Sequence, residues 1–307
     1  MQPVTIHVLG DVMLDRYLLG RAERISPEAP VPVVQVLERK EQPGGAGNVA
    51  ANIVGMGVHC VLFGLLGRDA VGQTLSDLLH DLGVDFRPLF CADRPSTHKT
   101  RIVAGGQQML RLDEEQTYPI PRPQDLIELL AKADFSGVWI VSDYAKGCCH
   151  PKVLEYVYAQ CREAGGICLT DPKSSDWSAY SGSHWISPNR KELAAYLGRE
   201  LPLNEAGIAE AMAEAERKSG ISNLLVTLSE LGMAYLHSGK LLRIPTQAQE
   251  VFDVSGAGDT VIAVLAVGLA QGLTVETALR RANRAAGIVV GKKGTVAIQR
   301  DWLEEMA

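Results

Sequence analysis

The sequence of 307 residues lacks a basic tract, a long apolar run and any paired spacing of cysteines. Its 30 Lys and Arg residues are scattered and are outnumbered by 36 Asp and Glu; they form no stripe with interleaved aromatics, which argues against nucleic-acid binding. The most apolar stretch, residues 260–273, is too short to span a bilayer and is expected to be a buried helix. A small molecule is therefore the favoured partner.

The six cysteines contain no C-x-x-C pair, and the N-terminus has neither the basic segment nor the apolar core of a secretory signal. Reduced thiols and a cytoplasmic location are therefore expected. Cys148, Cys149 and His150 are potential metal ligands, but side chains adjacent in sequence do not easily face one ion, so no metal site is expected there.

Short β-branched runs alternate with amphipathic segments along the chain. Most of the runs are almost continuously apolar, as in parallel strands that are buried on both faces. Strands are expected at residues 4–10, 60–67, 138–144, 166–172, 184–189 and 223–232, and helices at 46–56, 69–82, 123–133, 150–164 and 204–219. This alternation predicts an α/β fold with a doubly wound, mainly parallel sheet, formed by residues 1–307 as one domain.

Two segments interrupt the alternation. Residues 12–43 contain prolines at positions 27, 30, 32 and 43, which disfavour a helix and suit an exposed edge ribbon. Residues 86–113 alternate around Gly105-Gly106 as in a hairpin. Together the two insertions predict a small β-sheet that stands off the main domain as a lid.

Polar residues recur where the expected strands leave the sheet, namely Asp11, Asp143, Asp171, Asn189 and Thr227. Parallel α/β sheets bind ligands in the crevice beyond the carboxyl ends of their strands. Asp and Asn are also common helix N-caps, so each residue has a structural alternative. The recurrence at five strand ends favours a binding site at that edge of the sheet.

A first glycine cluster, residues 45–50, matches the G-x-G-x-x-A pattern of dinucleotide-binding loops. Such a loop follows directly on the first buried strand of its unit, whereas here a proline-rich segment separates the strand ending at Gly10 from the glycines. The context predicts a hinge between lid and helix rather than a nicotinamide site.

A second cluster, Ser255-Gly256-Ala257-Gly258, precedes an apolar helix and can direct consecutive amides to one point. A helix N-terminus of this kind favours an anion such as phosphate. Asp259 follows at once, and two interpretations of this acid stay open. It caps the helix, or it is a general base that takes a proton from a substrate hydroxyl during phosphoryl transfer.

Three motifs in order along the chain resemble signatures of the ribokinase-like sugar kinases, the phosphofructokinase B family: PGGAGN at 43–48, NRKE at 189–192 and DVSGAGDT at 253–260. Segments 10–17, 24–34, 142–147, 245–260 and 289–295 further resemble the D-glycero-β-D-manno-heptose 7-phosphate kinases of that family. In many bacteria such a kinase is fused to an adenylyltransferase domain. This chain ends soon after the kinase motifs and resembles the stand-alone form.

The resemblance implies a three-layer α/β/α fold and ATP-dependent phosphorylation of the anomeric hydroxyl of heptose 7-phosphate to the 1,7-bisphosphate, in ADP-heptose and lipopolysaccharide core synthesis. It also implies Mg²⁺, and a homodimer packed through the lid and its exposed ribbon PVPVVQV (30–36). Some members need a monovalent cation, a requirement that the sequence does not predict. The alternatives are a kinase of another sugar phosphate or nucleoside, a non-catalytic nucleotide- or sugar-binding regulator, and a dehydrogenase.

For catalysis, the resemblance makes Asp259 the base and the amides of Gly256, Ala257, Gly258 and Asp259 an anion hole. Asn189 and Glu192 would hold the waters of Mg²⁺–ATP, although an Asn with Glu three residues later is also a helix capping box. The remaining ATP contacts implied are Lys173, Thr227, Ser229, Glu230, Gly232 and, near the adenine, Asn283.

For the sugar, the resemblance implies contacts from Asp15, Gly45, Asn48, Asp143 and Lys146. The 7-phosphate needs cations, and the hairpin supplies Lys99, Arg101 and Arg111. Strand alternation puts Lys99 and Arg101 on one face, which suits a forked phosphate clamp. A solvated strand edge is the alternative, and it suits Arg111 less because Leu110 and Leu112 flank it.

Overall fold

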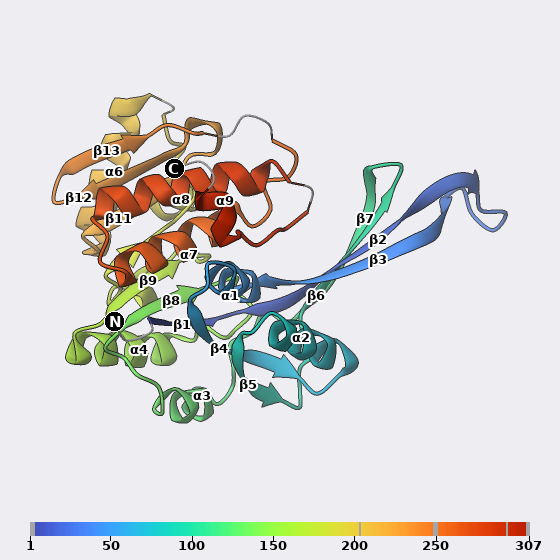
Figure 1. The fold of residues 1–307 in the computed structure, drawn as a ribbon, viewed down its shortest axis with the longest axis horizontal. Helices are drawn as coiled ribbons and strands as arrows, with labels where there is room; N and C mark the ends of the chain where they lie inside the picture. Colours follow the sequence, from blue (N-terminus) through green and yellow to red (C-terminus); the bar gives the residue numbers. More distant parts are fainter. Residues whose placement is uncertain (1–3, 203, 248–250, 293, 305–307) are drawn as a thin grey trace.

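The computed structural model describes residues 4–202, 204–247, 251–292 and 294–304. Residues 248–250 and 293, which fall within two of the segments that carry the resemblance, lie outside the described residues. The chain forms a layered body from which two long antiparallel ribbons project (Figure 1).

The body is built on a large sheet with strand order β13-β12-β11-β10-β9-β8-β1-β4-β5. Neighbours from β5 to β11 pair in parallel, and β12 and β13 are antiparallel. The strands are β1 (Thr5–Gly10), β4 (His59–Gly67), β5 (Asp85–Cys91), β8 (Val138–Ser142), β9 (Ile167–Asp171), β10 (Trp185–Ile186), β11 (Asn223–Thr227), β12 (Met233–His237) and β13 (Lys240–Ile244). The expected doubly wound, mainly parallel sheet is confirmed.

Helices cover both faces of this sheet. One layer contains α1 (Ala46–Gly55), α2 (Ala70–Asp81), α7 (Ala257–Ala270), α8 (Val275–Val290) and α9 (Arg300–Glu304); the other contains α3 (Pro123–Leu130), α4 (Pro151–Ala164), α5 (Arg190–Leu197) and α6 (Glu205–Ser219). Val8 and Leu9 of β1 are both fully buried, and they belong to the apolar clusters on opposite faces of the sheet. This two-sided burial explains the unbroken apolar strands. Two 3₁₀ turns, η1 (Ser178–Tyr180) and η2 (Ser229–Leu231), complete the body.

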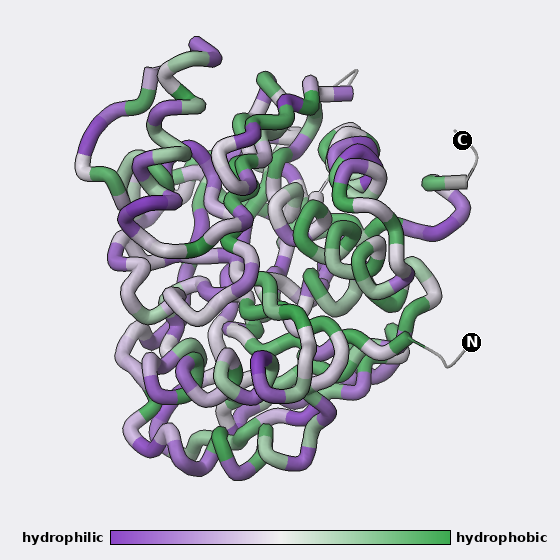
Figure 2. Tube along the Cα trace, turned by 90° about the vertical axis from the view of Figure 1, so that its left-hand side faces the viewer, coloured by the Kyte–Doolittle hydropathy of each residue, from purple (hydrophilic) through white to green (hydrophobic). Residues whose placement is uncertain are grey.

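Hydropathy follows the layers. Figure 2 shows hydrophobic chain in the interior of the body and hydrophilic chain along much of its outside. The expected buried helix is α7, in which every residue from Asp259 to Gly268 is buried. No helix in the described part of the chain is long and apolar enough to cross a membrane. All six cysteines are unpaired thiols, as expected.

The lid is a four-stranded sheet with order β3-β2-β6-β7. Its strands are β2 (Val12–Ile25), β3 (Pro32–Gly45), β6 (His98–Ala104) and β7 (Gln107–Glu114). The ribbon and the hairpin around Gly105-Gly106 lie where the sequence predicts them. Residues 86–91 differ from the expectation, because they form β5, pair with β4 and extend the main sheet. The β2–β6 pair is parallel, so the lid sheet is mixed.

Gly45 joins the lid to the body. It ends β3 with a φ of 57°, and α1 begins at the next residue. A Cβ at Gly45 would lie 2.5 Å from the carbonyl oxygen of Asp11, so the position requires glycine. Gly45 lies at the junction between lid and helix that the sequence predicts, and the glycines do not follow the first buried strand as a dinucleotide loop would.

Candidate active site

The carboxyl ends of the parallel strands converge at one edge of the body, where the lid begins. Asp11 and Asp171 lie at or next to the ends of β1 and β9, and Asp143 follows β8. An isolated bridge between Asn189 and Thr227 brings the ends of two further segments to the same edge. The structure therefore brings together the five polar strand ends singled out in the sequence.

Helix α7 starts at this edge with its amides available. Gly256 is its N-cap with a φ of 79°, and a Cβ there would lie 2.6 Å from Nδ2 of Asn48. Within the described residues, no carbonyl accepts a hydrogen bond from the amides of Gly258 and Asp259. The first turn of α7 therefore presents the unpaired amides and positive dipole end that suit an anion.

The carboxylate of Asp259 lies beside these amides and is 3% exposed. It accepts hydrogen bonds from Nδ2 of Asn48 at 2.8 Å and from the hydroxyl of Tyr144 at 2.6 Å. The α7 N-terminus has no side-chain cap, so the helix-cap interpretation of Asp259 is wrong. Burial raises the pKa of Asp259 to about 6, against the lowering effect of the two hydrogen bonds. A carboxyl group whose pKa lies this close to neutral pH suits a general base.

Asn189 and Glu192 form the capping box of α5. Oδ1 of Asn189 accepts from the amides of Lys191 and Glu192, and Oε2 of Glu192 accepts from the Asn189 amide. The capping alternative is thus realised in the geometry. Oε1 of Glu192 also pairs with Nζ of Lys173 at 3.2 Å. Burial and the charge of Glu192 raise the pKa of Asp171 well above its usual value, so these two acids repel each other where a cation would relieve them.

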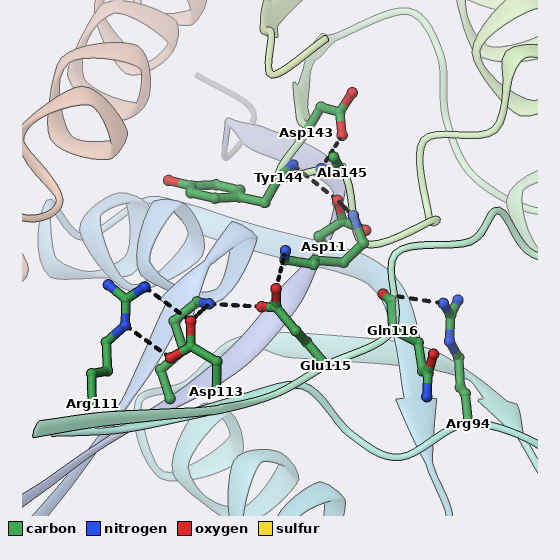
Figure 3. Close-up of polar contacts among 11 residues, drawn as sticks. Asp11, Arg94, Arg111, Asp113, Glu115, Gln116, Asp143, Tyr144 and Ala145 are labelled. Atoms are coloured by element: carbon green, nitrogen blue, oxygen red, sulfur yellow. Dashed lines mark hydrogen bonds and ion pairs between the residues drawn. The ribbon is translucent and has the colours of Figure 1, made fainter.

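The lid turns one polar face toward the site. The register aligns Asp15 with Lys99 and Asp113 across three strands, and Tyr17 with Arg101 and Arg111. Arg101 bonds to Asp15 at 2.5 Å, and Lys99 bonds to Asp113 and Glu115 at 3.0 and 2.7 Å. Arg111 bonds to Asp113 at 2.8 and 2.9 Å (Figure 3).

Exposure separates these cations. The side chains of Lys99 and Arg101 are 15% exposed and that of Arg111 is 49% exposed. The solvated-edge interpretation therefore fails for Lys99 and Arg101. It fits Arg111 better than expected, because β7 is the edge strand and the flanking Leu110 and Leu112 are themselves half exposed.

The side chains of Lys146 and Asp143, both in the loop after β8, have partners in different parts of the structure. Nζ of Lys146 bonds to Oε1 of Glu115 at 2.7 Å and so joins the lid network. The carboxylate of Asp143 accepts from the amide of Ala145 at 2.7 Å and from the hydroxyl of Tyr180 in a short hydrogen bond. The described contacts of Asp143 are within the body, whereas the sequence interpretation gave it a sugar contact.

Two important residues were missed. Tyr144, which bonds to Asp259, lies in segment 142–147, which carries part of the family resemblance but gives no role to this tyrosine. Asp11 was noted only as a strand end, although its carboxylate accepts from three amides of the loop, those of Tyr144, Lys146 and Cys148, each at 2.9 Å. Burial and Asp143 raise the pKa of Asp11 to about 6. An aspartate opposite a loop of amides has no sequence signal of its own.

Asp11 and Asp143 also approach Cys149 closely enough to resemble a metal-binding group. The oxygens of Asp11 are already engaged by the loop amides. Neighbouring His150 caps α4 through its Nδ1, which accepts from the amide of Lys152. Of residues 148–150, Cys149 belongs to this group, while His150 caps a helix.

The expected nucleotide contacts lie along the far half of the same edge. Thr227 ends β11, and Ser229 and Gly232 turn the chain with φ values of 54° and 81° around η2, which also contains Glu230. Asn283 of α8 is buried and donates to the carbonyl of Pro245 at 2.8 Å. The structure gives Asn283 this structural bond, and the nucleotide contacts stay predictions.

Comparison with known proteins places this site in context. The model of the pfkB family carbohydrate kinases matches residues 5–302. The chain is 43% identical over 99% of its length to the bifunctional protein HldE of Methylobacillus flagellatus, and 45% identical over 97% to that of Escherichia coli O9:H4. It spans 63% and 62% of the length of these two relatives.

Two solved structures share the fold over nearly the whole chain. Phosphofructokinase-2 from Escherichia coli, in complex with substrates and products, matches with a TM-score of 0.82 and 20% identity, covering 98% of this chain and 97% of that one. The ribokinase of Arabidopsis thaliana complexed with ribose and ATP matches with a TM-score of 0.77 and 23% identity, covering 100% and 99%. The three-layer ribokinase-like fold expected from the sequence is confirmed.

Proposed function

Because the chain belongs to the pfkB family of carbohydrate kinases, we propose that it transfers the γ-phosphoryl group of ATP to the anomeric hydroxyl of D-glycero-β-D-manno-heptose 7-phosphate. The product is the 1,7-bisphosphate, a precursor in ADP-heptose and lipopolysaccharide core synthesis. Similarity to proteins named HldE over almost the whole chain supports this assignment. The proposal concerns only the part of those relatives that the chain spans.

The observation that carries the proposal is the buried Asp259 carboxylate at the open N-terminus of α7. Asp259 takes the proton of the anomeric hydroxyl, the freed oxygen bonds to the γ-phosphorus, and the bond to the β-phosphate oxygen of ATP breaks. The amides of Gly256, Ala257, Gly258 and Asp259 stabilise the charge of the transferring group. Such a base contributes about 10²–10⁴ in rate, and loss of one such donor costs about 2.7–4 kcal/mol.

The residues near α5 fit a magnesium ion. Carboxylate and amide oxygens suit Mg²⁺, which keeps several of its waters. Asn189 and Glu192 would hold it through water, and Asp171 adds a second carboxylate whose pKa is raised by burial and then by repulsion from Glu192. The ion neutralises charge on the ATP phosphates when bound. Lys173, Thr227, Ser229, Glu230 and Gly232 would bind the nucleotide along this edge, with Asn283 near the adenine.

The polar face of the lid supplies the sugar-phosphate site. Arg101 and Arg111 lie directly opposite each other on β6 and β7, and each is paired with a carboxylate, Arg101 with Asp15 and Arg111 with Asp113. Lys99 and Lys146 meet at Glu115 on the same side. We assign the 7-phosphate to this group of cations, and the sugar hydroxyls to Asp15, Asn48 and the backbone at Gly45.

A homodimer and a cytoplasmic location complete the proposal. Apolar side chains are exposed on the lid, with Val31 52%, Leu37 59%, Leu110 52% and Leu112 49% exposed. A second lid covering them would remove this surface from water. The six unpaired cysteines suit a reducing compartment.

The test is turnover of ATP with a panel of sugars and sugar phosphates, with the product identified by phosphorus NMR. A phosphate on the anomeric carbon of heptose 7-phosphate, formed faster than on other acceptors, is expected. Faster turnover of another sugar or a nucleoside would replace the substrate assignment. Nucleotide binding without turnover of any acceptor would favour a non-catalytic regulator.

A further inference from the structure

The loop between β8 and α4 carries Tyr144, whose side chain reaches Asp259, the proposed general base. The hydroxyl of Tyr144 donates to Oδ1 of Asp259 at 2.6 Å, while Nδ2 of Asn48 donates to Oδ2. Each carboxylate oxygen thus has one donor and keeps a lone pair. In Figure 3 the ring of Tyr144 points away from the loop that carries it.

The loop that carries Tyr144 is tightly held. Asp11 accepts hydrogen bonds from the amides of Tyr144, Lys146 and Cys148. Asp143 accepts from the amide of Ala145, which has a positive φ of 55°. A side chain at Gly45 would approach the Tyr144 ring to 3.4 Å, so the lid hinge borders the ring. The backbone therefore determines where the Tyr144 hydroxyl lies.

The charges that face Asp259 are unfavourable to its ionised form. Asp15 on β2 raises its pKa, and the charge of Asp259 in turn raises that of Asp171 on β9. The charge of Glu192 on α5 also raises the pKa values of Asp171 and Tyr144, beyond the effect of burial on each. The nearby cations are paired elsewhere, Lys173 with Glu192 and Arg101 with Asp15.

Besides the positive end of the α7 dipole, the neutral donors from α1 and the β8–α4 loop favour the carboxylate. Burial and the charge of Asp259 raise the pKa of Tyr144 well above its usual value. Its hydroxyl stays protonated and acts as a donor throughout the working pH range.

We propose that Tyr144 is a positioning residue for phosphoryl transfer: its hydroxyl holds the Asp259 carboxylate ionised and oriented, so that a free lone pair can take the proton of the sugar hydroxyl. This inference rests on the proposed function of Asp259 as the base. Asp11 acts one step further away, because it holds the loop that carries Tyr144.

The test replaces Tyr144 with Phe, which removes the donor and keeps the ring. A hydrogen bond to a charged group of this kind is worth about one to two pKa units. The acid limb of the plot of kcat against pH should move to higher pH by that amount. The kcat of Tyr144→Phe should then be about tenfold or more below that of the wild type at pH 6, and close to it at pH 9. The KM for ATP should not change. Titration of the sugar phosphate cancels because both variants use the same substrate.

Tyr158→Phe is the matched control. Tyr158 is buried on α4 and its hydroxyl bonds to Oγ1 of Thr170 at 2.8 Å, away from Asp259. Its loss should lower stability without moving the pH profile. A loss of kcat in Tyr144→Phe that is the same at every pH, or no loss at all, would overturn the proposal.

A second measurement needs no substrate. The carboxyl carbon of Asp259 can be followed by NMR in protein labelled at aspartate, with Asp259→Asn identifying the resonance. The midpoint of its pH titration should be higher in Tyr144→Phe than in the wild type, and an unchanged midpoint would overturn the proposal. If the wild type does not turn over heptose 7-phosphate while this midpoint still shifts, the substrate assignment fails and the role of Tyr144 stands.

Discussion

Asn48 and Asp259 are 211 residues apart in sequence, yet Nδ2 of Asn48 donates a 2.8 Å hydrogen bond to Oδ2 of Asp259. The bond joins the first turn of α1, which follows the lid hinge, to the first turn of α7. Both glycine-rich segments of the sequence therefore meet at one carboxylate. The Asp259 carboxylate therefore lies next to the junction between the lid and the body.

Asp259→Asn should abolish turnover while leaving nucleotide binding intact. The change keeps the shape of the side chain but removes the proton acceptor, so the rate should fall by about 10²–10⁴. The measurements are phosphoryl transfer and calorimetric binding of an ATP analogue. Asp77→Asn, at a surface acid of α2 that accepts from Gln73, is the control and should behave as wild type. Turnover near that of the wild type in Asp259→Asn would refute the base assignment.

Comparing Gly256→Ala with Gly165→Ala should distinguish the cost of backbone strain in stability from the effect of the α7 N-terminus on catalysis. The new Cβ would lie 2.6 Å from Nδ2 of Asn48, in a backbone conformation with φ 79°. Gly165→Ala, at the end of α4, introduces the same kind of strain at φ 74° with open space around the Cβ. Both should lose about 1–2 kcal/mol of unfolding free energy. Only Gly256→Ala should also lose about tenfold or more in kcat, because it disturbs the anion hole. Equal activity in the two variants would contradict this.

Substitution of the lid cations should weaken binding of the sugar phosphate. Lys99→Gln, Arg101→Gln and Arg111→Gln should each raise its KM about tenfold or more, since a charge-assisted bond is lost, and leave the KM for ATP unchanged. Arg16→Gln is the control, because Arg16 pairs with Glu41 on the opposite face of β2. Steady-state kinetics with both substrates distinguish the sites. If KM for the sugar phosphate is unaffected, the phosphate is bound elsewhere.

His7 should make the protein less stable in acid. Burial lowers its pKa from 6.5 to about 4, with its ring stacked on Trp139 at 4.7 Å between centroids. The unfolded chain therefore binds more protons between these values, and stability is lost as pH falls through this window. Asp11 and Asp259, with pKa raised to about 6, act in the opposite direction, so variants must be compared.

His7→Phe keeps an aromatic ring and removes the titration. From pH 7 to pH 5 the wild type should lose about 2 kcal/mol of unfolding free energy relative to this variant. Denaturant unfolding at the two pH values measures the difference. A parallel pH dependence of the two proteins would show that His7 does not titrate as inferred.

The sequence alone predicted the elements whose signals are local. Continuous apolar runs identified the buried parallel strands, the prolines identified the lid ribbon, and residues 255–259 identified the start of the buried helix α7. The sequence near residues 86–91 does not show whether they belong to the lid or to the main sheet. An edge strand such as β5, half buried and rich in aromatics, has the same pattern as a lid strand, and only its pairing with β4 separates them.

The side-chain partners at the site were decided by the tertiary structure alone. Residue type marked Asp259, Asn48 and the lid cations as candidates. It did not indicate that Tyr144 would bond to Asp259 or that Asp143 would bond to Tyr180. It also could not show that Asp113 and Glu115 would neutralise Lys99. Backbone conformation and periodicity depend on near neighbours in the chain. Hydrogen bonds between residues on different strands, helices or loops, from 14 to 115 positions apart, depend on how the sheet, the helices and the lid pack together.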